Sequence, residues 1–274
     1  MFDTHIDWVA IGFDSRNEGT ALLLNNLISS DPDARENSRQ ELGLKIFAED
    51  KASKGTAVLL RYAIDVLQDI LSPPPKAALI LFLAESLRSI RYYLVDHPQD
   101  EEALAALNLF RARYEIFREL LIDSTPEIRM QAISLMLELS FTMPEIRFFL
   151  VQRFIELSEH DSDSRVQVAA ITSTASMGNA LPNFDVYAWL RTLFNREGSD
   201  FIRYVIAWSW LKFIDADLPH EILQLLNDIK SNLVILGDWE YADEVKFNGQ
   251  HSYSFLEYYS PEVLQPLNTA SLDG

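Results

Sequence analysis

The sequence contains no cysteine, and it has only 9 glycines and 11 prolines among its 274 residues. Without cysteine the chain can form neither disulfides nor thiolate metal sites, and it has no cysteine nucleophile. The few glycines and prolines leave few of the tight turns that a many-stranded sheet requires. These absences favour long helices over an all-β fold.

Positive charge is also scarce. The chain has 23 basic and 41 acidic residues, which give a formal net charge of −18 and a pI near 4.6. Such a surface repels phosphate backbones, and no run of the sequence concentrates lysine and arginine on one face, so we expect no nucleic-acid ligand. The same charge would attract a basic protein partner and speed its association. Solubility alone is the other explanation of the acidity.

Long hydrophobic runs are absent as well. The most apolar stretch, 77–83, is too short to cross a bilayer, and Glu85 and Arg88 follow it closely. The first residues lack the basic and apolar regions of a signal peptide. We therefore expect a cytoplasmic protein that does not bind membranes.

The sequence shows no recognisable catalytic pattern. Its five histidines stand at positions 5, 97, 160, 220 and 251, and no two of them have the spacing that places two metal ligands on one helix face. His160 with Asp161 and Asp163 could in principle bind a divalent cation, but helix capping in a turn explains these residues more simply. Glycine motifs that bind phosphate are absent. We predict no cofactor, no metal site, no catalytic residue and no enzymatic activity.

Apolar residues at helical spacing are the main positive signal. Within 62–71 the apolar positions form a broad face that Asp65 and Gln68 interrupt. Apolar residues at 133, 136 and 137 repeat the same spacing, and alternation with period two is scarce. The pattern predicts an all-α fold.

A short polar segment, followed by a basic residue and an apolar helix, recurs along the chain. The basic residues stand at 35, 76, 129, 165 and 203, at successive steps of 41, 53, 36 and 38 residues. Three of these steps suit a two-helix repeat, and the 53-residue step predicts an insertion near 92–103. In each segment Ser, Thr or Asp would cap a helix, and proline suits its first position. The helices that precede the last two segments are predicted at 145–159 and 185–195.

These segments resemble the HEAT-repeat superfamily, in which an Asp-Pro-x-x-Arg motif opens the second helix of each pair. The likeness covers about residues 20 to 235 and is strongest at 31–35 and 126–129. The sequence departs from the motif at Lys76 and at Ser164, where the preceding proline is missing.

The resemblance implies a right-handed α-α superhelix, a HEAT-like solenoid, over 1–236 and an atypical C-terminal capping segment over 237–274. The chain is most similar to bacterial HEAT-repeat proteins of this length, some of which are immunity proteins encoded near toxins. The resemblance to these immunity proteins implies a non-enzymatic scaffold that binds and occludes a basic toxin or effector. HEAT-like enzymes that act on DNA lesions or on chromophore-bearing proteins are the alternative. The opening arginines of HEAT repeats usually contact the neighbouring repeat, which implies a structural role for Arg35, Arg129, Arg165 and Arg203.

Side chains on the second helices are the first candidates for partner binding, because these helices line the concave surface of HEAT-type arrays. Trp208 and Trp210 lie two residues apart on a helix and point in different directions, which predicts one of them at a surface. Packing of both indoles between repeats is the alternative, since 201–214 is apolar almost all round. The candidates are Gln131, Ser134, Gln167, Thr172, Tyr204, Trp208 and Lys212.

The acidic and aromatic segment 215–262 is the second candidate. It contains 10 acidic and 2 basic residues. Aromatic rings would supply contact area for a basic partner, and carboxylates would steer it. The segment could instead close the open end of the helical core, because a terminal repeat needs a polar outer face. The residues of interest are Asp238, Trp239, Glu240, Tyr241, Asp243 and Glu244.

Overall fold

The computed structural model describes residues 19–48, 51–70, 72–178 and 180–213, together with positions 220, 222 and 224. Within these residues the chain forms eleven α-helices, a short 3₁₀ helix and a two-stranded hairpin. The predicted all-α fold is therefore confirmed. The chain divides into two compact units, Met1–Leu181 and Pro182–Gly274. The predicted capping segment, 237–274, lies outside the described residues.

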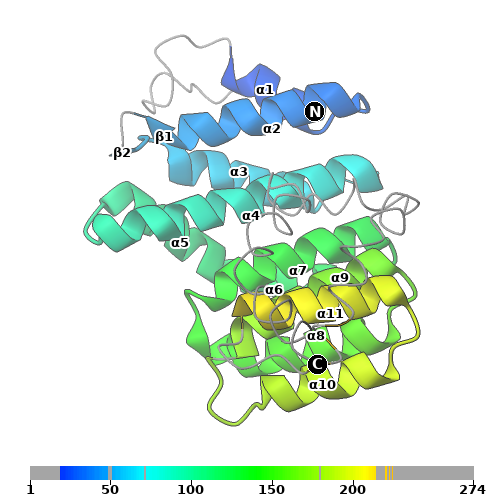
Figure 1. Cartoon of the computed structure of the whole chain (residues 1–274). Helices are drawn as coiled ribbons and strands as arrows, with labels where there is room; N and C mark the ends of the chain where they lie inside the picture. The colour runs from blue at the N-terminus through cyan, green and yellow to red at the C-terminus, as the bar shows by residue number, and fades with distance from the viewer. Residues whose placement is uncertain are drawn as a thin grey trace, which may run out of the picture. The chain divides into compact units, whose positions relative to one another are not determined.

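Nine of the helices described belong to the first unit, where most of them pack against their neighbours in sequence (Figure 1). The elements are α1 (Thr20–Leu27), α2 (Pro32–Ile46), β1 (Phe47–Ala48), β2 (Lys51–Ala52), α3 (Thr56–Leu67), α4 (Pro73–Asp96), α5 (Glu101–Ala112), α6 (Tyr114–Leu120), α7 (Pro126–Ser140), the 3₁₀ helix η1 (Pro144–Ile146), α8 (Arg147–His160) and α9 (Ser164–Gly178). The second unit contributes α10 (Val186–Arg196) and α11 (Asp200–Phe213).

A helix begins at each of the five polar segments that the sequence singled out. Proline is the first residue of three of these helices. Its fixed φ suits the first turn, and the backbone N–H that it lacks would have no intrahelical acceptor there. The Asp31 carboxylate caps α2 by accepting a hydrogen bond from the Asp33 N–H at 3.0 Å. The helices and their first residues are α2 at Pro32, α4 at Pro73, α7 at Pro126, α9 at Ser164 and α11 at Asp200.

The helices that open at these segments follow one another in the first unit. Helix α2 packs against α4, α4 against α7, and α7 against α9. Each has a second helix at its side, since α1 packs on α2, α3 on α4, α6 on α7 and α8 on α9. Helix α3 also packs against α5, so the order is mostly sequential with some longer-range contacts. The predicted first helix at 145–159 corresponds to η1 and α8.

Helix α4 departs from this regular size. It has 24 residues, whereas α2, α7 and α9 have 15 each. The nine additional residues lengthen it by about 14 Å at about 1.5 Å per residue. The region 92–103, where the sequence predicted an insertion, contains the end of α4, a turn and the start of α5. The nine additional residues of α4 therefore account for about half or more of the excess of the 53-residue step over the other three steps.

Apolar side chains from every helix form the core of the first unit. Phe82, Phe110, Phe117 and Phe154 are among the largest side chains that are completely buried. Phe110 of α5 and Phe117 of α6 lie with their ring centroids 6.0 Å apart, which fixes these two short helices against each other. In the part of the chain that the structure describes, no helix combines the length and apolarity needed to cross a bilayer.

Candidate functional site

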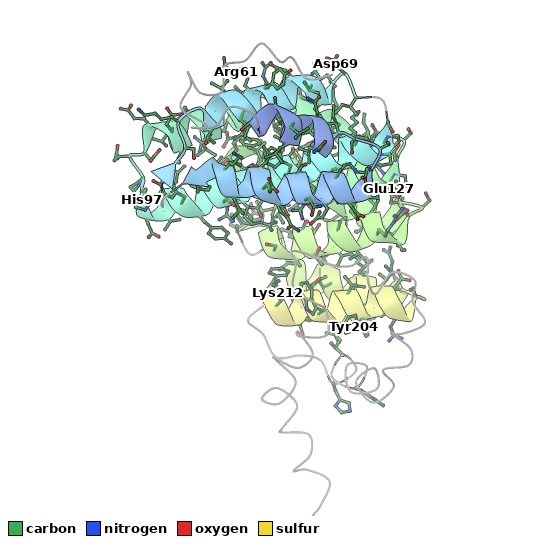
Figure 2. All side chains as sticks on the ribbon, turned by 90° about the horizontal axis from the view of Figure 1, so that it is seen from above. Arg61, Asp69, His97, Glu127, Tyr204 and Lys212 are labelled. Atoms are coloured by element: carbon green, nitrogen blue, oxygen red, sulfur yellow. The ribbon has the colours of Figure 1, made fainter. Side chains whose placement is uncertain are left out.

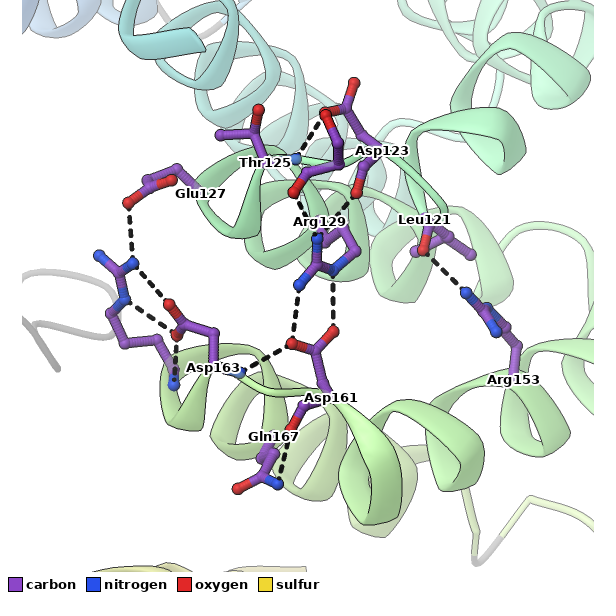
Figure 3. A network of polar contacts seen from close by, with 11 residues as sticks. Leu121, Asp123, Thr125, Glu127, Arg129, Arg153, Asp161, Asp163 and Gln167 are labelled. Carbon is purple, nitrogen blue, oxygen red and sulfur yellow. Dashed lines mark hydrogen bonds and ion pairs between the residues drawn. The ribbon is translucent and has the colours of Figure 1, made fainter.

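Arg129 ties the N-terminal end of α7 to that of α9 (Figure 3). Its Nε and Nη2 donate to the two carboxylate oxygens of Asp161 at 2.8 and 2.7 Å. Its Nη1 donates to the backbone carbonyls of Asp123 and Ser124 at 2.8 and 3.1 Å. The hydrogen bonds to Asp161 raise the pKa of Arg129 above its ordinary value. Both side chains of this pair are largely buried, so the contact is protected from water.

Arg165 of α9 makes a second link to α7. Its Nη2 donates to the Glu127 carboxylate at 2.8 Å and to the Asp163 carboxylate at 2.7 Å. Its Nε donates to the other Asp163 oxygen at 3.0 Å. One guanidinium thus holds one carboxylate from α7 and one from the turn before α9. Arg129 on α7 thus reaches the turn before α9, and Arg165 on α9 reaches back to α7. We call these two arginines and their three carboxylate partners the repeat-end network: Arg129, Asp161, Arg165, Asp163 and Glu127.

The Asp163 carboxyl makes part of this network dependent on pH. Hydrogen bonding from the Arg165 side chain lowers the pKa of Asp163. Its stabilising effect is therefore complete above its unfolded pKa of about 3.9 and is lost as the pH falls through the lower native value. We expect Asp163→Asn to lower the free energy of unfolding at pH 7 and to weaken its decline below about pH 4. Urea denaturation across this range measures the effect.

The Asp69→Asn variant, which removes a carboxylate from an exposed position, is the control for this prediction and should change the free energy of unfolding by less than about 0.5 kcal/mol. An Asp163→Asn profile displaced by the same amount at every pH would contradict the proposed link to Arg165.

Arg35 and Arg203, which were also predicted to be structural, and Lys76 at the weaker segment make different contacts. Arg35 donates from Nη1 to the Ser29 carbonyl at 2.9 Å, which lies in the turn before its own helix. Lys76 at the start of α4 pairs with Asp123 at 3.6 Å, across to the turn before α7. In the second unit, the Arg203 guanidinium lies 4.5 Å from the centroid of the Phe194 ring.

A buried carboxylate on α7 binds two arginines of α4. Glu138 is only 3% exposed. Its Oε1 accepts a hydrogen bond from Arg88 Nε at 2.6 Å, and its Oε2 accepts from Arg91 Nε and Nη2 at 3.2 and 3.0 Å. The Arg91 guanidinium also lies over the rings of Tyr92 and Phe141, 4.3 and 4.7 Å from their centroids. One contact between α4 and α7 therefore combines ion pairs, hydrogen bonds and cation–π stacking.

A related contact joins α2 to α4. Arg39 of α2 forms ion pairs with Glu85 of α4 and, at 2.5 Å, with Glu36 one turn away on its own helix. The hydrogen bond from Arg39 lowers the pKa of Glu36. The stack from α2 through α4 to α7 is thus joined by arginine–glutamate pairs as well as by apolar packing.

The sequence did not reveal these arginine–glutamate pairs. Glu138 stands in an apolar run, and Arg88 and Arg91 belong to the helix that contains Lys76, where the sequence departs from the HEAT motif. The available signal was a pair of arginines three residues apart on an apolar helix, which face the same side and need a common partner when buried.

The predicted binding residues of the first unit fall into two groups. Gln131 and Ser134 are half-buried on α7, at the spacing that places them on the same side as Glu138. Gln167 of α9 donates its amide to the Asp161 carbonyl at 2.9 Å. Thr172 is buried, and its hydroxyl bonds to carbonyls of its own helix. Gln167 and Thr172 are therefore engaged within the fold.

In the second unit, the predicted residues on α11 also differ from one another. Trp210 is completely buried and meets Tyr187 of α10 edge to face, with ring centroids 4.5 Å apart. Trp208 is half-buried, and the Lys212 ammonium lies 4.6 Å from its ring centroid. The two indoles thus occupy different environments, as their spacing predicts. Tyr204 is buried at 8% exposure.

Burial of Tyr204 has a consequence at alkaline pH. It raises the pKa of the phenol to about 12. The unfolded chain, with a tyrosine pKa of about 10, ionises first, so this residue lowers stability as the pH rises above about 10. We expect Tyr204→Phe to remove a phenolate absorbance component that titrates near pH 12 in the native protein. In urea the component should move to about pH 10; a native component that already titrates there would contradict the burial of this phenol.

The candidates of the acidic and aromatic segment lie outside the described residues. They are Asp238, Trp239, Glu240, Tyr241, Asp243 and Glu244.

The arrangement of carboxylates also bears on metal binding. Among the described residues, no group of three His, Cys, Asp or Glu side chains is placed to hold a metal ion. Asp161 and Asp163, which the sequence offered with His160 as cation ligands, bind Arg129 and Arg165.

In comparisons with protein-family models, with curated proteins and with solved structures, nothing matches this chain. The HEAT resemblance therefore rests on the repeated sequence segments alone.

Proposed function

We propose that this chain is a non-enzymatic scaffold whose helix pairs form a HEAT-like, right-handed solenoid that binds another protein. The observation that carries the proposal is the repeat-end network, in which Arg129 reaches forward to Asp161 and Arg165 reaches back to Glu127. These are contacts between neighbouring repeats of the kind that the HEAT resemblance implies. A stack of such repeats offers an extended surface to a macromolecule rather than an enclosed pocket to a small one.

The charge of the chain favours a basic partner. The described residues contain 24 acidic and 20 basic side chains, a net charge of −4, so most of the total of −18 lies elsewhere in the chain. Many of the described arginines are paired with carboxylates, as in the repeat-end network. The excess negative charge would therefore attract cationic proteins and oppose nucleic acids. An immunity-type protein that occludes a basic toxin or effector fits these properties.

Affinity capture at low and at high salt tests this function. The tagged full-length chain is the bait in a lysate of its native host, and mass spectrometry identifies the captured protein. We expect a basic protein whose association rate with the purified chain falls steeply with salt, because screening weakens long-range attraction. Co-expression of the chain should then restore growth to cells that the captured protein inhibits. An acidic partner, or an affinity that salt leaves unchanged, would refute the electrostatic model.

A further inference from the structure

The end of α4 and the start of α5 form an exposed corner, residues 92–102, which we call the α4–α5 corner. Figure 1 shows this end of α4, with α5, extending past the end of α7. In Figure 2, His97 of the corner and Glu127 of the repeat-end network lie at opposite ends of the first unit. The α4 part of the corner, residues 92–96, belongs to the nine residues by which α4 exceeds α2, α7 and α9 in length. The regular stacking of 15-residue helices does not require this part.

The corner exposes apolar side chains next to carboxylates. Tyr92 and Val95 are 59% and 71% exposed and stand three residues apart on α4, on the same side of the helix. Asp96, which follows Val95, and Glu101, which opens α5, are exposed in the same segment. The segment 92–102 contains four acidic residues and no lysine or arginine. Because the last turn of α4 has no basic residue, the partial negative charge of its C-terminal carbonyls adds to this potential.

Contacts behind the corner hold it in place. The Tyr93 ring lies between Phe47, at a centroid distance of 5.0 Å, and His97, at 4.4 Å. Its hydroxyl donates to Asp100 at 2.9 Å, across the turn between the two helices. Arg91, anchored by Glu138, lies against the Tyr92 ring. A surface fixed in this way loses little conformational entropy when a partner binds it.

We propose that the α4–α5 corner docks a cationic segment of the partner, in which lysine or arginine alternates with apolar side chains. The inference rests on the proposed function and names the surface that performs it. Tyr92 and Val95 would contact the apolar side chains, and Asp96 and Glu101 would pair with the cations. The exposed Phe148 of α8 is a useful contrast, because the segment 146–155 around it contains no acidic residue.

Fluorescent labels at single sites test the proposal, since a chain without cysteine can be labelled at one introduced thiol. Val95→Cys carries an environment-sensitive dye at the corner, and Phe148→Cys carries the same dye at the control site. The probe is a peptide of alternating arginine and leucine, and its own anisotropy reports total binding. We expect a saturable blue shift at position 95 and no shift at position 148.

Charge reversal gives the second measurement. Asp96→Lys with Glu101→Lys should weaken the response at position 95 by about tenfold or more, because attraction becomes repulsion. Glu41→Lys with Glu145→Lys is the matched control: it changes the net charge equally at exposed sites and should shift affinity by about twofold or less. Circular dichroism and thermal unfolding verify that each variant is folded.

Three results would overturn the docking surface. If anisotropy shows that the peptide binds but the dye at position 95 does not respond, the proposed function stands and the corner is not its binding surface. Equal losses in the two charge-reversal variants would assign the binding to overall charge. A blue shift at position 95 that grows with protein concentration in the absence of peptide would show that a second copy of the chain occupies the corner. Absence of any salt-sensitive peptide binding to the wild type would overturn both the corner and the electrostatic basis of the proposed function.

Discussion

Glu138→Ala should lower the free energy of unfolding by about 3 kcal/mol, because it leaves two arginines of α4 without their shared carboxylate in a largely buried contact. We take the lower part of the range for broken buried ion pairs, since Arg88 and Arg91 retain some access to water. The loss should appear as a lower urea midpoint with an unchanged slope.

Two further variants show where this energy comes from. Glu145→Ala removes an exposed carboxylate from the short helix that follows α7 and should change stability by less than about 0.5 kcal/mol. Replacing Arg88, Arg91 and Glu138 together with methionine should recover much of the lost stability, because no buried charge then lacks a partner. If the triple variant is as unstable as Glu138→Ala, the cost arises from packing rather than from unpaired charge.

The helix starts could be predicted from the sequence because their causes are local. Pro32, Pro73 and Pro126 fix the first turns of α2, α4 and α7, and these prolines constrain the chain whatever packs around them. Helix geometry likewise predicted that Trp208 and Trp210 point in different directions, but it did not say that Trp210 would be the buried one.

The partners of buried charges could not be predicted in this way. Glu138 meets Arg88 and Arg91 from about fifty positions away, and only the packing of α7 on α4 brings them together. The length of α4 is a similar case. The polar residues after Val95 predict an insertion, whereas the structure continues the helix to Asp96. In this part of α4, Arg91 and Tyr93 contact Phe141 and Phe47, which are distant in the sequence.

The predicted binding surface depends on packing as well. Gln167 and Thr172 stand at positions suited to an exposed helix face, yet both are engaged with backbone carbonyls. Conversely, the exposure of Tyr92 and Val95 follows from the extension of α4 past its neighbours, which no local pattern encodes. Sequence reasoning therefore found the helices and their starts more reliably than the surface that these helices display.

Arg129→Ala should be about as destabilising as the loss of Glu138, with a cost of about 3 kcal/mol, because Asp161 is left buried without its cation and two backbone carbonyls lose a donor. Arg129→Lys should recover only part of this, since an ammonium cannot reproduce the planar fork that binds both Asp161 oxygens. Arg61→Ala, at an exposed position on α3, is the control and should cost less than about 0.5 kcal/mol.

A double-mutant cycle separates the Arg129–Asp161 pair from its surroundings. Arg129→Ala and Asp161→Ala should show a coupling energy of about 2 kcal/mol, within the range for residues in one ion-pair network. The bond runs from the start of one helix pair to the turn before the next, so this coupling measures how far the stability of one repeat depends on its neighbour. Additive effects would mean that the Arg129–Asp161 contact contributes nothing to holding α7 and α9 together, which would leave apolar packing and the Arg165–Glu127 contact to do so. The repeat-end network would then lose its value as evidence for HEAT-type stacking, and the proposed scaffold would have to rest on charge.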